Sequence, residues 1–351
     1  MYMKKTIALL LCILFGLSSF SALARGEWEE SQDWKAYFEN KDYEMAFPLI
    51  CAAADSGDVE AMAYMAVCYI FGYAVEPDPE KSLDYAMEAA ALGNARAMNL
   101  LGVLYKTGRG VEQDDQKATE WYRKAADLGD TEAMINIGAC YEAGEGVEQD
   151  VQKAMEWYHK AADLGDIIAM YNIGVLYYKG LGVEQNNQKA IEWYRKPAEH
   201  GYVDAMYNMA IAFAEEGEYQ EAVKWHKKAA DLGKVQSMLF LGGYYFDGYG
   251  VEVNYQKAME WFLKAADLGE PRAMTNIGIM YACGIGYEMD YQKAVEWFKK
   301  GAALWEPEAM YNLGIAYENG LGVKQNDQMA MEWYQQSAAL GDLNAYMKLI
   351  G

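Results

Sequence analysis

Glycines recur along the chain at a nearly constant spacing, and this repeat limits the possible folds more than any other feature. The step between neighbouring glycines is 36 residues, apart from one step of 32, and Trp305 stands at the one missing point of the series. A chain of 351 residues is longer than a single compact core usually becomes, and a fixed period of this length is typical of stacked helical repeats. The glycines are Gly57, Gly93, Gly129, Gly165, Gly201, Gly233, Gly269 and Gly341.

Each repeat is predicted to form two helices. In one full repeat Ala133, Ile137 and Tyr141 lie four residues apart, which places them on one face of a first helix. Gly138 lies beside this stripe and would let a neighbouring helix approach closely. After a Gly-x-Gly-Val loop, the second helix is expected to begin at an Asp or Asn, whose side-chain oxygen caps free backbone N–H groups. These residues are Asp78, Asp114, Asp150, Asn186, Asn254, Asp290 and Asn326.

The second helix of each repeat carries its apolar residues on one face. Ala154, Trp157, Ala161 and Leu164 share this face in one repeat, and Gly165 fits the position just after a helix end. A helix pair of this size cannot bury such a face alone, so the pairs must stack. Tryptophans recur at one position of the second helix, and this strict spacing favours a place in the core over a cofactor-binding box. They are Trp121, Trp157, Trp193, Trp225, Trp261, Trp297 and Trp333.

The ends of the array and one repeat in its middle depart from the pattern. Asp33–Gly57 is predicted to form a shorter helix pair that caps the N-terminal end, and Leu343–Ile350 a single helix that closes the other end. The 32-residue unit replaces the Gly-x-Gly loop with a shorter one around Gly217. Pro197 lies inside a second helix, where proline kinks or frays the helix. We therefore expect a change of curvature near residues 197–220 that divides the array into two arms.

The first residues have the layout of a secretory signal peptide. Lys4 and Lys5 precede an apolar stretch, and Ala22 and Ala24 provide the small residues of a cleavage site. The alternative is an uncleaved membrane anchor, but the apolar stretch is short for a membrane span. The sequence therefore predicts export, with the periplasm as the favoured compartment, the extracellular space as the alternative and no membrane insertion after cleavage.

The net charge and the cysteines further limit which partners and which kinds of site are possible. The formal net charge is -22, which repels nucleic acid and makes a basic protein surface the natural electrostatic complement. No basic stripe suited to nucleic acid is present. Outside the predicted signal peptide the cysteines form no C-x-x-C pair and are expected to be small buried apolar residues. These are Cys51, Cys68, Cys140 and Cys283.

The repeated motif is Ala-Met-x-Asn-φ-Gly-x-x-Tyr, then Gly-x-Gly-Val, then Lys-Ala-x-Glu-Trp-Tyr-x-Lys-Ala-Ala. It resembles the Sel1-like repeat, a relative of the tetratricopeptide repeat, in an exported bacterial member. The resemblance implies an all-α fold, a right-handed α/α solenoid (superhelix) of stacked helix-turn-helix repeats. Together with the predicted signal peptide (1–24), an N-terminal capping helix pair (25–60) and a C-terminal capping helix (342–351), the chain is expected to contain eight such repeats (61–341). The short tetratricopeptide-like unit among them is at 205–233.

The family resemblance also implies scaffold or adaptor work through a concave groove lined by the first helices. Residues that vary between repeats on those helices are candidates for contact with a protein or peptide. Tyrosine offers large contact area, and asparagine offers a donor and an acceptor to a peptide backbone. The alternative is that each Asn bonds to the adjacent helix and each Tyr packs between repeats. The candidates are Asn136, Tyr171, Asn172, Tyr178, Tyr207, Asn208, Tyr311 and Asn312.

Catalysis is not predicted, and neither a metal nor a cofactor is expected. The histidines, His159, His200 and His226, share no helix with metal-binding spacing. No Ser-x-x-Lys or Gly-x-Ser-x-Gly motif provides a serine nucleophile. The sequence favours a binding protein, and an immunity protein that inhibits a secreted toxin is the sharper form of this prediction. The alternative is a hydrolase acting on a β-lactam or on cell-wall material, which the resemblance suggests through the cysteine-rich branch of the family.

Overall fold

The chain is all-helical in the part that the computed structural model describes, residues 34–350, which contains no strand. The all-α prediction is therefore confirmed. The signal peptide predicted at residues 1–24 lies outside the described residues. Among the residues from 34 to 350, no helix combines the length and the apolar character needed to span a bilayer.

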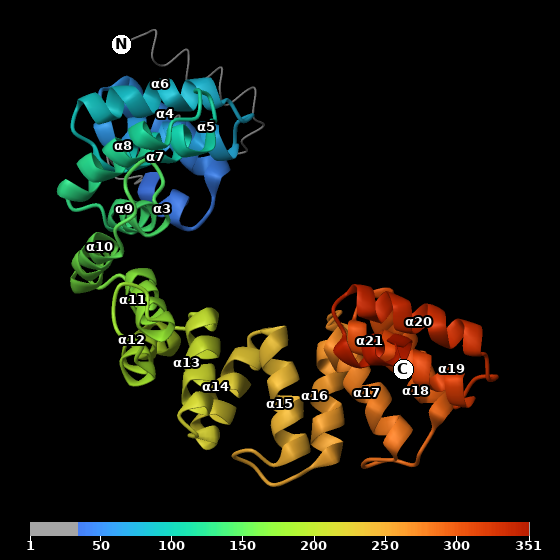
Figure 1. Cartoon of the computed structure of the whole chain (residues 1–351). Helices are drawn as coiled ribbons and strands as arrows, with labels where there is room; N and C mark the ends of the chain where they lie inside the picture. Colours follow the sequence, from blue (N-terminus) through green and yellow to red (C-terminus); the bar gives the residue numbers. More distant parts are fainter. Residues whose placement is uncertain (1–33, 351) are drawn as a thin grey trace, which may run out of the picture. The chain divides into compact units, whose positions relative to one another are not determined.

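The helices fall into two compact units, one that ends at Ala154 and one that begins at Met155. From its start to residue 143, each helix of the first unit packs on the next one along the chain. Figure 1 shows these helices in blue and green. They are α3 (Trp34–Glu39), α4 (Tyr43–Asp55), α5 (Val59–Phe71), α6 (Pro79–Ala91), α7 (Ala95–Thr107), α8 (Asp115–Asp127) and α9 (Thr131–Ala143), followed by α10 (Val151–Asp163), which contains the division.

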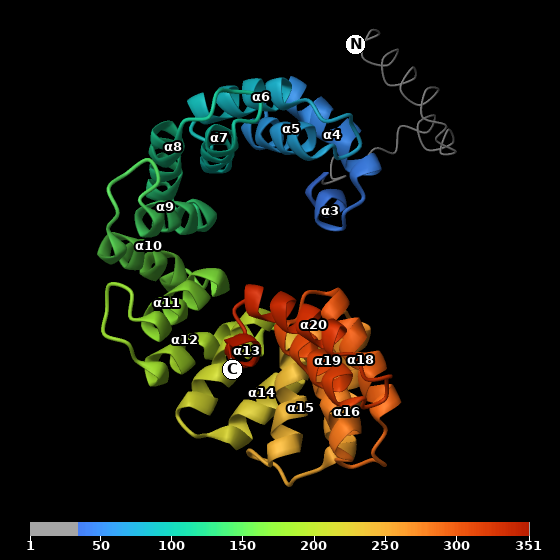
Figure 2. The same ribbon diagram turned by 45° about the vertical axis from the view of Figure 1, so that its right-hand side comes forward.

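The second unit repeats the same helix pair, and again each helix packs on its sequence neighbour. The yellow-green to red helices in Figure 2 follow this order. They are α11 (Ile167–Lys179), α12 (Asn187–Glu199), α13 (Val203–Glu215), α14 (Tyr219–Asp231), α15 (Val235–Asp247), α16 (Tyr255–Asp267), α17 (Pro271–Cys283), α18 (Tyr291–Ala303), α19 (Pro307–Asn319), α20 (Asp327–Ala339) and α21 (Leu343–Ile350).

Local side-chain chemistry sets the helix ends as predicted. All seven expected caps accept a hydrogen bond from the backbone N–H three residues later, at 2.9–3.1 Å. The repeated glycine after each second helix has a positive φ, 94° at Gly165, which residues with a Cβ adopt at a cost. Trp305 occupies the same position with φ 62° and is 70% exposed.

The core of each repeat is built on a glycine in the first helix that faces an aromatic ring in the second. A Cβ added to Gly174 would lie 2.5 Å from the ring of Tyr194, which is fully buried. The predicted close approach of the two helices is thus confirmed at the glycines equivalent to Gly138. The same arrangement joins Gly102 to Tyr122, Gly242 to Phe262, Gly278 to Phe298 and Gly314 to Tyr334, with a Cβ 2.3–2.4 Å from the ring.

The prediction for the tryptophans is wrong in its detail. Six of the seven are half-buried and only Trp225 is buried, whereas the residue after each tryptophan lies in the core. A lysine three residues on covers the ring of five tryptophans, at 3.6–4.1 Å from its centroid. The tryptophans therefore form the rim of the core. Leu164, predicted to share the buried face, is 61% exposed.

Pro197 does not end its helix, because α12 continues to Glu199 and the Pro197 carbonyl accepts hydrogen bonds from the backbone of His200 and Tyr202. The predicted division into two arms near residues 197–220 is wrong, since α12 packs on α13 and the units divide at Ala154 instead.

The expectation that the cysteines are buried holds only in part. Cys68 and Cys140 are buried, Cys51 is half-buried and Cys283 is exposed.

Candidate functional site

The predicted contact residues lie on first helices, as their position in the repeat requires. Tyr171, Asn172 and Tyr178 belong to α11, and Tyr207 and Asn208 belong to α13, the next first helix along the chain. All five are half-buried. Two further candidates, Tyr311 and Asn312, lie on α19 in the same unit, and Asn136 lies on α9 in the unit that ends at Ala154.

A hydrogen bond joins α11 to α13 through two of these residues. The side-chain amide of Asn208 donates to the Tyr171 hydroxyl oxygen at 3.0 Å. The Tyr171 ring packs edge-on against Tyr202 at a centroid distance of 5.0 Å, and its burial raises the pKa of its hydroxyl, so this group is protonated at neutral pH. The side-chain carbonyl oxygen of Asn208 stays available for a further hydrogen bond.

Tyr178 belongs to a small polar cluster between α11, α12 and α13. Its hydroxyl donates to the Glu215 carboxylate at 2.6 Å, and the Asn187 side-chain amide donates to the other oxygen of the same carboxylate at 3.2 Å. Burial, with the hydrogen bond to Glu215 as the next cause, raises the pKa of Tyr178 to about 12. The Asn187 side-chain oxygen is buried and has no hydrogen-bond partner in the described part of the chain.

A polar hollow of about 330 Å³ adjoins this cluster, lined by Gln185, Asn186, Asn187, Gln188 and Glu216. The Gln188 amide donates to the Glu216 carboxylate at 3.5 Å. Asn187, whose oxygen is buried, and Glu216, whose carboxylate is a charged hydrogen-bond acceptor, both line it. The hollow is therefore suited to a group that donates hydrogen bonds and carries positive charge.

Tyr207 is held by charged and aromatic neighbours. The Lys234 ammonium lies 5.0 Å from its ring centroid and pairs with the Asp204 carboxylate at 2.6 Å. The rings of His226 and Phe240 lie 5.7 Å and 6.2 Å from it. The side chain is thus fixed in orientation and presents an aromatic edge that is only half-buried.

The four predicted asparagines differ in whether their side chains form hydrogen bonds within the described part of the chain. The Asn136 amide donates to the side-chain oxygen of Asn99 at 2.9 Å, so Asn136 and Asn208 both bond to an adjacent repeat, as the alternative reading required. The side chains of Asn172 and Asn312 make no hydrogen bond to any residue from 34 to 350. Tyr311 packs on Tyr334 at 5.7 Å. Contact of these eight residues with a protein or peptide stays a prediction.

The residues that sequence reasoning missed are Glu215, Glu216 and Asn187. The signal was present, because the short unit ends its first helix with two successive glutamates where the other repeats have the glycine-rich loop. The helical period alone does not say that these carboxylates face the polar start of α12. That contact follows from the packing of α12 on α13.

The three histidines have separate sets of neighbours. His226 is fully buried and its Nδ1 lies 3.1 Å from the Ser237 hydroxyl, while burial lowers its pKa to about 3. His200 Nδ1 bonds to the Lys196 carbonyl at 2.8 Å, and His159 packs edge-on against Trp193. Among residues 34–350, no group of three or more His, Cys, Asp or Glu side chains is arranged to hold a metal ion.

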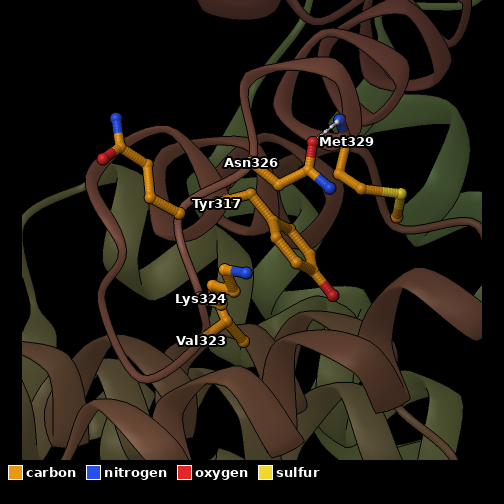
Figure 3. A pocket seen from close by; sticks show the side chains of 6 residues that line it. Tyr317, Val323, Lys324, Asn326 and Met329 are labelled. Carbon is orange, nitrogen blue, oxygen red and sulfur yellow. Dashed lines mark hydrogen bonds between the residues drawn. The ribbon is translucent and has the colours of Figure 1, made fainter.

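A second hollow, of about 530 Å³, lies at the loop between α19 and α20. Figure 3 shows its lining side chains, with the Tyr317 ring between Asn326 and Lys324. None of the eight predicted contact residues lines it. The lining residues are Tyr317, Val323, Lys324, Gln325, Asn326 and Met329.

Comparison with known families matches most of the chain. The sequence model of the Sel1 repeat matches residues 59–94, 95–130, 131–166, 167–202, 235–270, 271–304 and 307–342. A tetratricopeptide repeat model matches residues 205–234, which contain the short unit. The search of curated proteins gave no match.

Solved structures with the same repeat are similar to this chain. A Sel1 repeat protein from Oxalobacter formigenes has 26% sequence identity and a TM-score of 0.67, over 86% of this chain and 89% of that one. The protective antigen c5321 of uropathogenic Escherichia coli, which displays an SLR fold, has 31% identity and a TM-score of 0.51, over 90% of this chain and 77% of that one. The immunity protein Pa5087 from Pseudomonas aeruginosa has 20% identity and a TM-score of 0.37, over 60% and 81%, which is too low to support a functional argument.

Proposed function

Because this chain belongs to the Sel1 repeat family, we propose that it is a non-enzymatic scaffold that binds a basic segment of another protein. The binding surface consists of Tyr171, Asn172, Tyr178, Tyr207 and Asn208 together with the hollow beside Glu216. Half-buried tyrosines and an unbonded asparagine amide supply contact area and backbone hydrogen bonds at little entropic cost. The preference for a basic segment comes from the acceptors at the edge of this surface.

The observation that carries the proposal is the Asn187 side-chain oxygen. It is buried without a hydrogen-bond partner in the described chain, beside a hollow that also contains the Glu216 carboxylate. A buried polar atom without a partner costs free energy, of the order of 1–3 kcal/mol. An arginine or lysine of a partner in this hollow would pair with the Glu216 carboxylate, and a rotation of the Asn187 side chain toward the hollow would let the same group donate to its oxygen. The formal net charge of -22 favours the approach of such a partner over long distances.

The predicted export places this binding in the bacterial envelope, with the periplasm as the proposed compartment. The proposal has a finer form, in which the partner is a secreted toxin and the chain is its immunity protein. A tight one-to-one complex that abolishes the partner's activity is expected in that case. An adaptor would instead bind several partners more weakly.

The test compares how the wild type and two charge-reversal variants capture proteins from an envelope extract. Glu215→Lys/Glu216→Lys reverses the charge beside the hollow at two exposed positions. Glu192→Lys/Glu260→Lys makes the same change of net charge on exposed positions of second helices in the same unit and serves as the control. A partner retained by the wild type and the control but lost by the first variant is the expected result.

Two outcomes would contradict the proposal. Equal capture by all three forms would remove the site from α11, α12 and α13. Loss in both variants would mean that net charge, and not this surface, governs the interaction. Turnover of a β-lactam or of cell-wall fragments by the purified chain would favour the hydrolase alternative instead.

A further inference from the structure

A lysine covers a tyrosine ring in six of the repeats. In each case the lysine stands three residues after the cap of the second helix, and its ammonium lies 5.1–5.4 Å from the ring centroid of the tyrosine that precedes the loop. Where the cap is an aspartate, the same ammonium also pairs with its carboxylate at 3.1–3.3 Å. The six pairs are Tyr69 with Lys81, Tyr105 with Lys117, Tyr141 with Lys153, Tyr177 with Lys189, Tyr245 with Lys257, and Tyr281 with Lys293.

The last long repeat breaks this arrangement at two positions. Met329 stands where the six other repeats have the lysine, and Lys324 stands where they have a glutamate. No cation covers the Tyr317 ring, and the Lys324 ammonium pairs with no carboxylate of the described chain. The hollow of about 530 Å³ opens over this uncovered ring (Figure 3).

The two changes make the local charge more positive. In the other long-loop repeats, the glutamate, the cap and the lysine together carry -1 with an Asp cap and 0 with an Asn cap. In the last repeat Lys324, Asn326 and Met329 together carry +1, in a chain whose formal net charge is -22. The acidic group nearest in sequence, Asp327, accepts a hydrogen bond from the Gln325 amide at 3.5 Å. Asp327 does not line the hollow, so Lys324 is the one charged residue in a lining that is otherwise polar and apolar.

We propose that this hollow binds a carboxylate that lies beside an apolar side chain of a peptide. The Lys324 ammonium would pair with the carboxylate. The exposed amide of Asn326 and the Tyr317 hydroxyl, which has no hydrogen bond within residues 34–350, would donate to it. Val323, Met329 and the uncovered face of the Tyr317 ring form the apolar part of the wall. A volume of this size lies in the range of small-ligand sites and suits one or two residues of a peptide.

This site is distinct from the surface proposed above for basic segments. The two lie on different helices of the same unit and have opposite charge, so either can fail without the other. A peptide carboxylate can come from a C-terminus or from an Asp or Glu side chain. Both sources share the chemistry that Lys324 would recognise.

A nearly identical loop in the same unit provides a matched control. Residues 180–183 and 320–323 both read Gly-Leu-Gly-Val, and Gln185 and Asn186 repeat as Gln325 and Asn326. The loops differ in charge at Glu184 and Lys189, the counterparts of Lys324 and Met329, and at Asn187, the counterpart of Asp327. Lys324→Glu/Met329→Lys therefore gives the last loop the residues of the other repeats. Glu184→Lys/Lys189→Met moves the proposed site to the loop between α11 and α12.

The experiment measures fluorescence anisotropy of labelled peptides with the full chain. The first peptide ends in Leu-Phe with a free carboxylate, the second is its C-terminal amide, and the third is an amide with an internal Asp-Phe. The wild type is expected to bind the first peptide. Lys324→Glu/Met329→Lys should weaken this binding about tenfold or more, since it reverses the charge and covers the ring. Addition of Glu184→Lys/Lys189→Met to that variant should restore binding.

Each result supports or contradicts the proposal. Binding of the third peptide as well as the first means that side-chain carboxylates are recognised, and binding of the first alone means that the site reads a C-terminus. The proposal is wrong if the amide of the first peptide binds as well as the acid, or if Lys324→Glu/Met329→Lys binds as the wild type does. It is equally wrong if the wild type binds no peptide up to about 1 mM. Circular dichroism melts establish that the variants are folded, which is expected because their loops use residues of this chain's other repeats.

Discussion

Gly174→Ala tests the argument that a glycine facing a ring sets the distance between the two helices of a repeat. The added Cβ would lie 2.5 Å from Cε1 and 2.6 Å from Cδ1 of Tyr194. Tyr194 is fully buried, so its ring has no open space into which to move. In the short unit the glycine is replaced by Ala210, and the facing residue is the smaller ring of His226. The chain itself thus pairs the larger helix residue with the smaller ring.

The expected change in the free energy of unfolding of Gly174→Ala follows from two opposing effects. Overpacking a filled core costs about 1–3 kcal/mol, and replacing a helical glycine by alanine gains about 0.5–1 kcal/mol of backbone entropy. Gly174→Ala is therefore expected to lower the free energy of unfolding by up to about 2.5 kcal/mol. Gly243→Ala is the control, because Gly243 also lies within a helix but a Cβ there meets nothing within 4 Å. It is expected to raise the free energy of unfolding by about 0.5–1 kcal/mol.

Urea unfolding followed by circular dichroism measures both variants under one set of conditions. Tyr194→His and the double variant Gly174→Ala/Tyr194→His complete a double-mutant cycle. A favourable coupling of about 1 kcal/mol or more is expected, because the smaller ring makes room for the added methyl group. The reasoning is refuted if Gly174→Ala is as stabilising as Gly243→Ala, or if the cycle shows no coupling.

Three further predictions concern single features of the fold. Burial lowers the pKa of His226 to about 3, below its ordinary value of 6.5, so the unfolded chain takes up the extra proton and stability is lost as the pH falls through this window. Between pH 7 and pH 5 the wild type should lose about 2 kcal/mol more than Ala210→Gly/His226→Phe, measured by urea unfolding at both values. Trp305→Gly should raise the melting temperature, since it removes the left-handed strain at φ 62° that costs about 1–2 kcal/mol, and an unchanged or lower value would contradict this. An aromatic disulfide reagent should label Cys283 in the folded chain but Cys68 only after unfolding, because Cys68 is buried and its pKa is raised to about 12.

The helix pairs and their ends were predictable from the sequence because their causes are local. An aspartate such as Asp114 caps the helix that follows it through its own side chain, and a glycine such as Gly165 ends a helix through its own φ. Neither effect depends on distant parts of the chain. The 36-residue period then repeats the same local solution, which is why all seven caps could be named in advance.

The depth of each side chain was less predictable, because it depends on how the helices pack. Trp157 and Tyr158 are neighbours in sequence, and both fit an apolar face within the helical period. The structure buries the second of the pair and leaves the first at the rim. The glycine of the preceding helix decides between them, since only the residue after the tryptophan meets it, as Tyr194 meets Gly174. That choice is a property of the helix pair and not of one helix.

The candidate sites show the same division between what is local and what depends on packing. The residue types of the first helices singled out Tyr171 and Asn208, but their mutual hydrogen bond depends on the distance between two repeats. The hollow at Tyr317 follows from substitutions that comparison of the loops within this chain reveals. Where one repeat replaces the lysine and the glutamate together, the fold is kept and the local charge is changed. Such substitutions are tolerated at positions that cap no helix and fill no core. In a repeat protein, the residues that depart from the chain's own repeat pattern are therefore the most informative guide to binding sites.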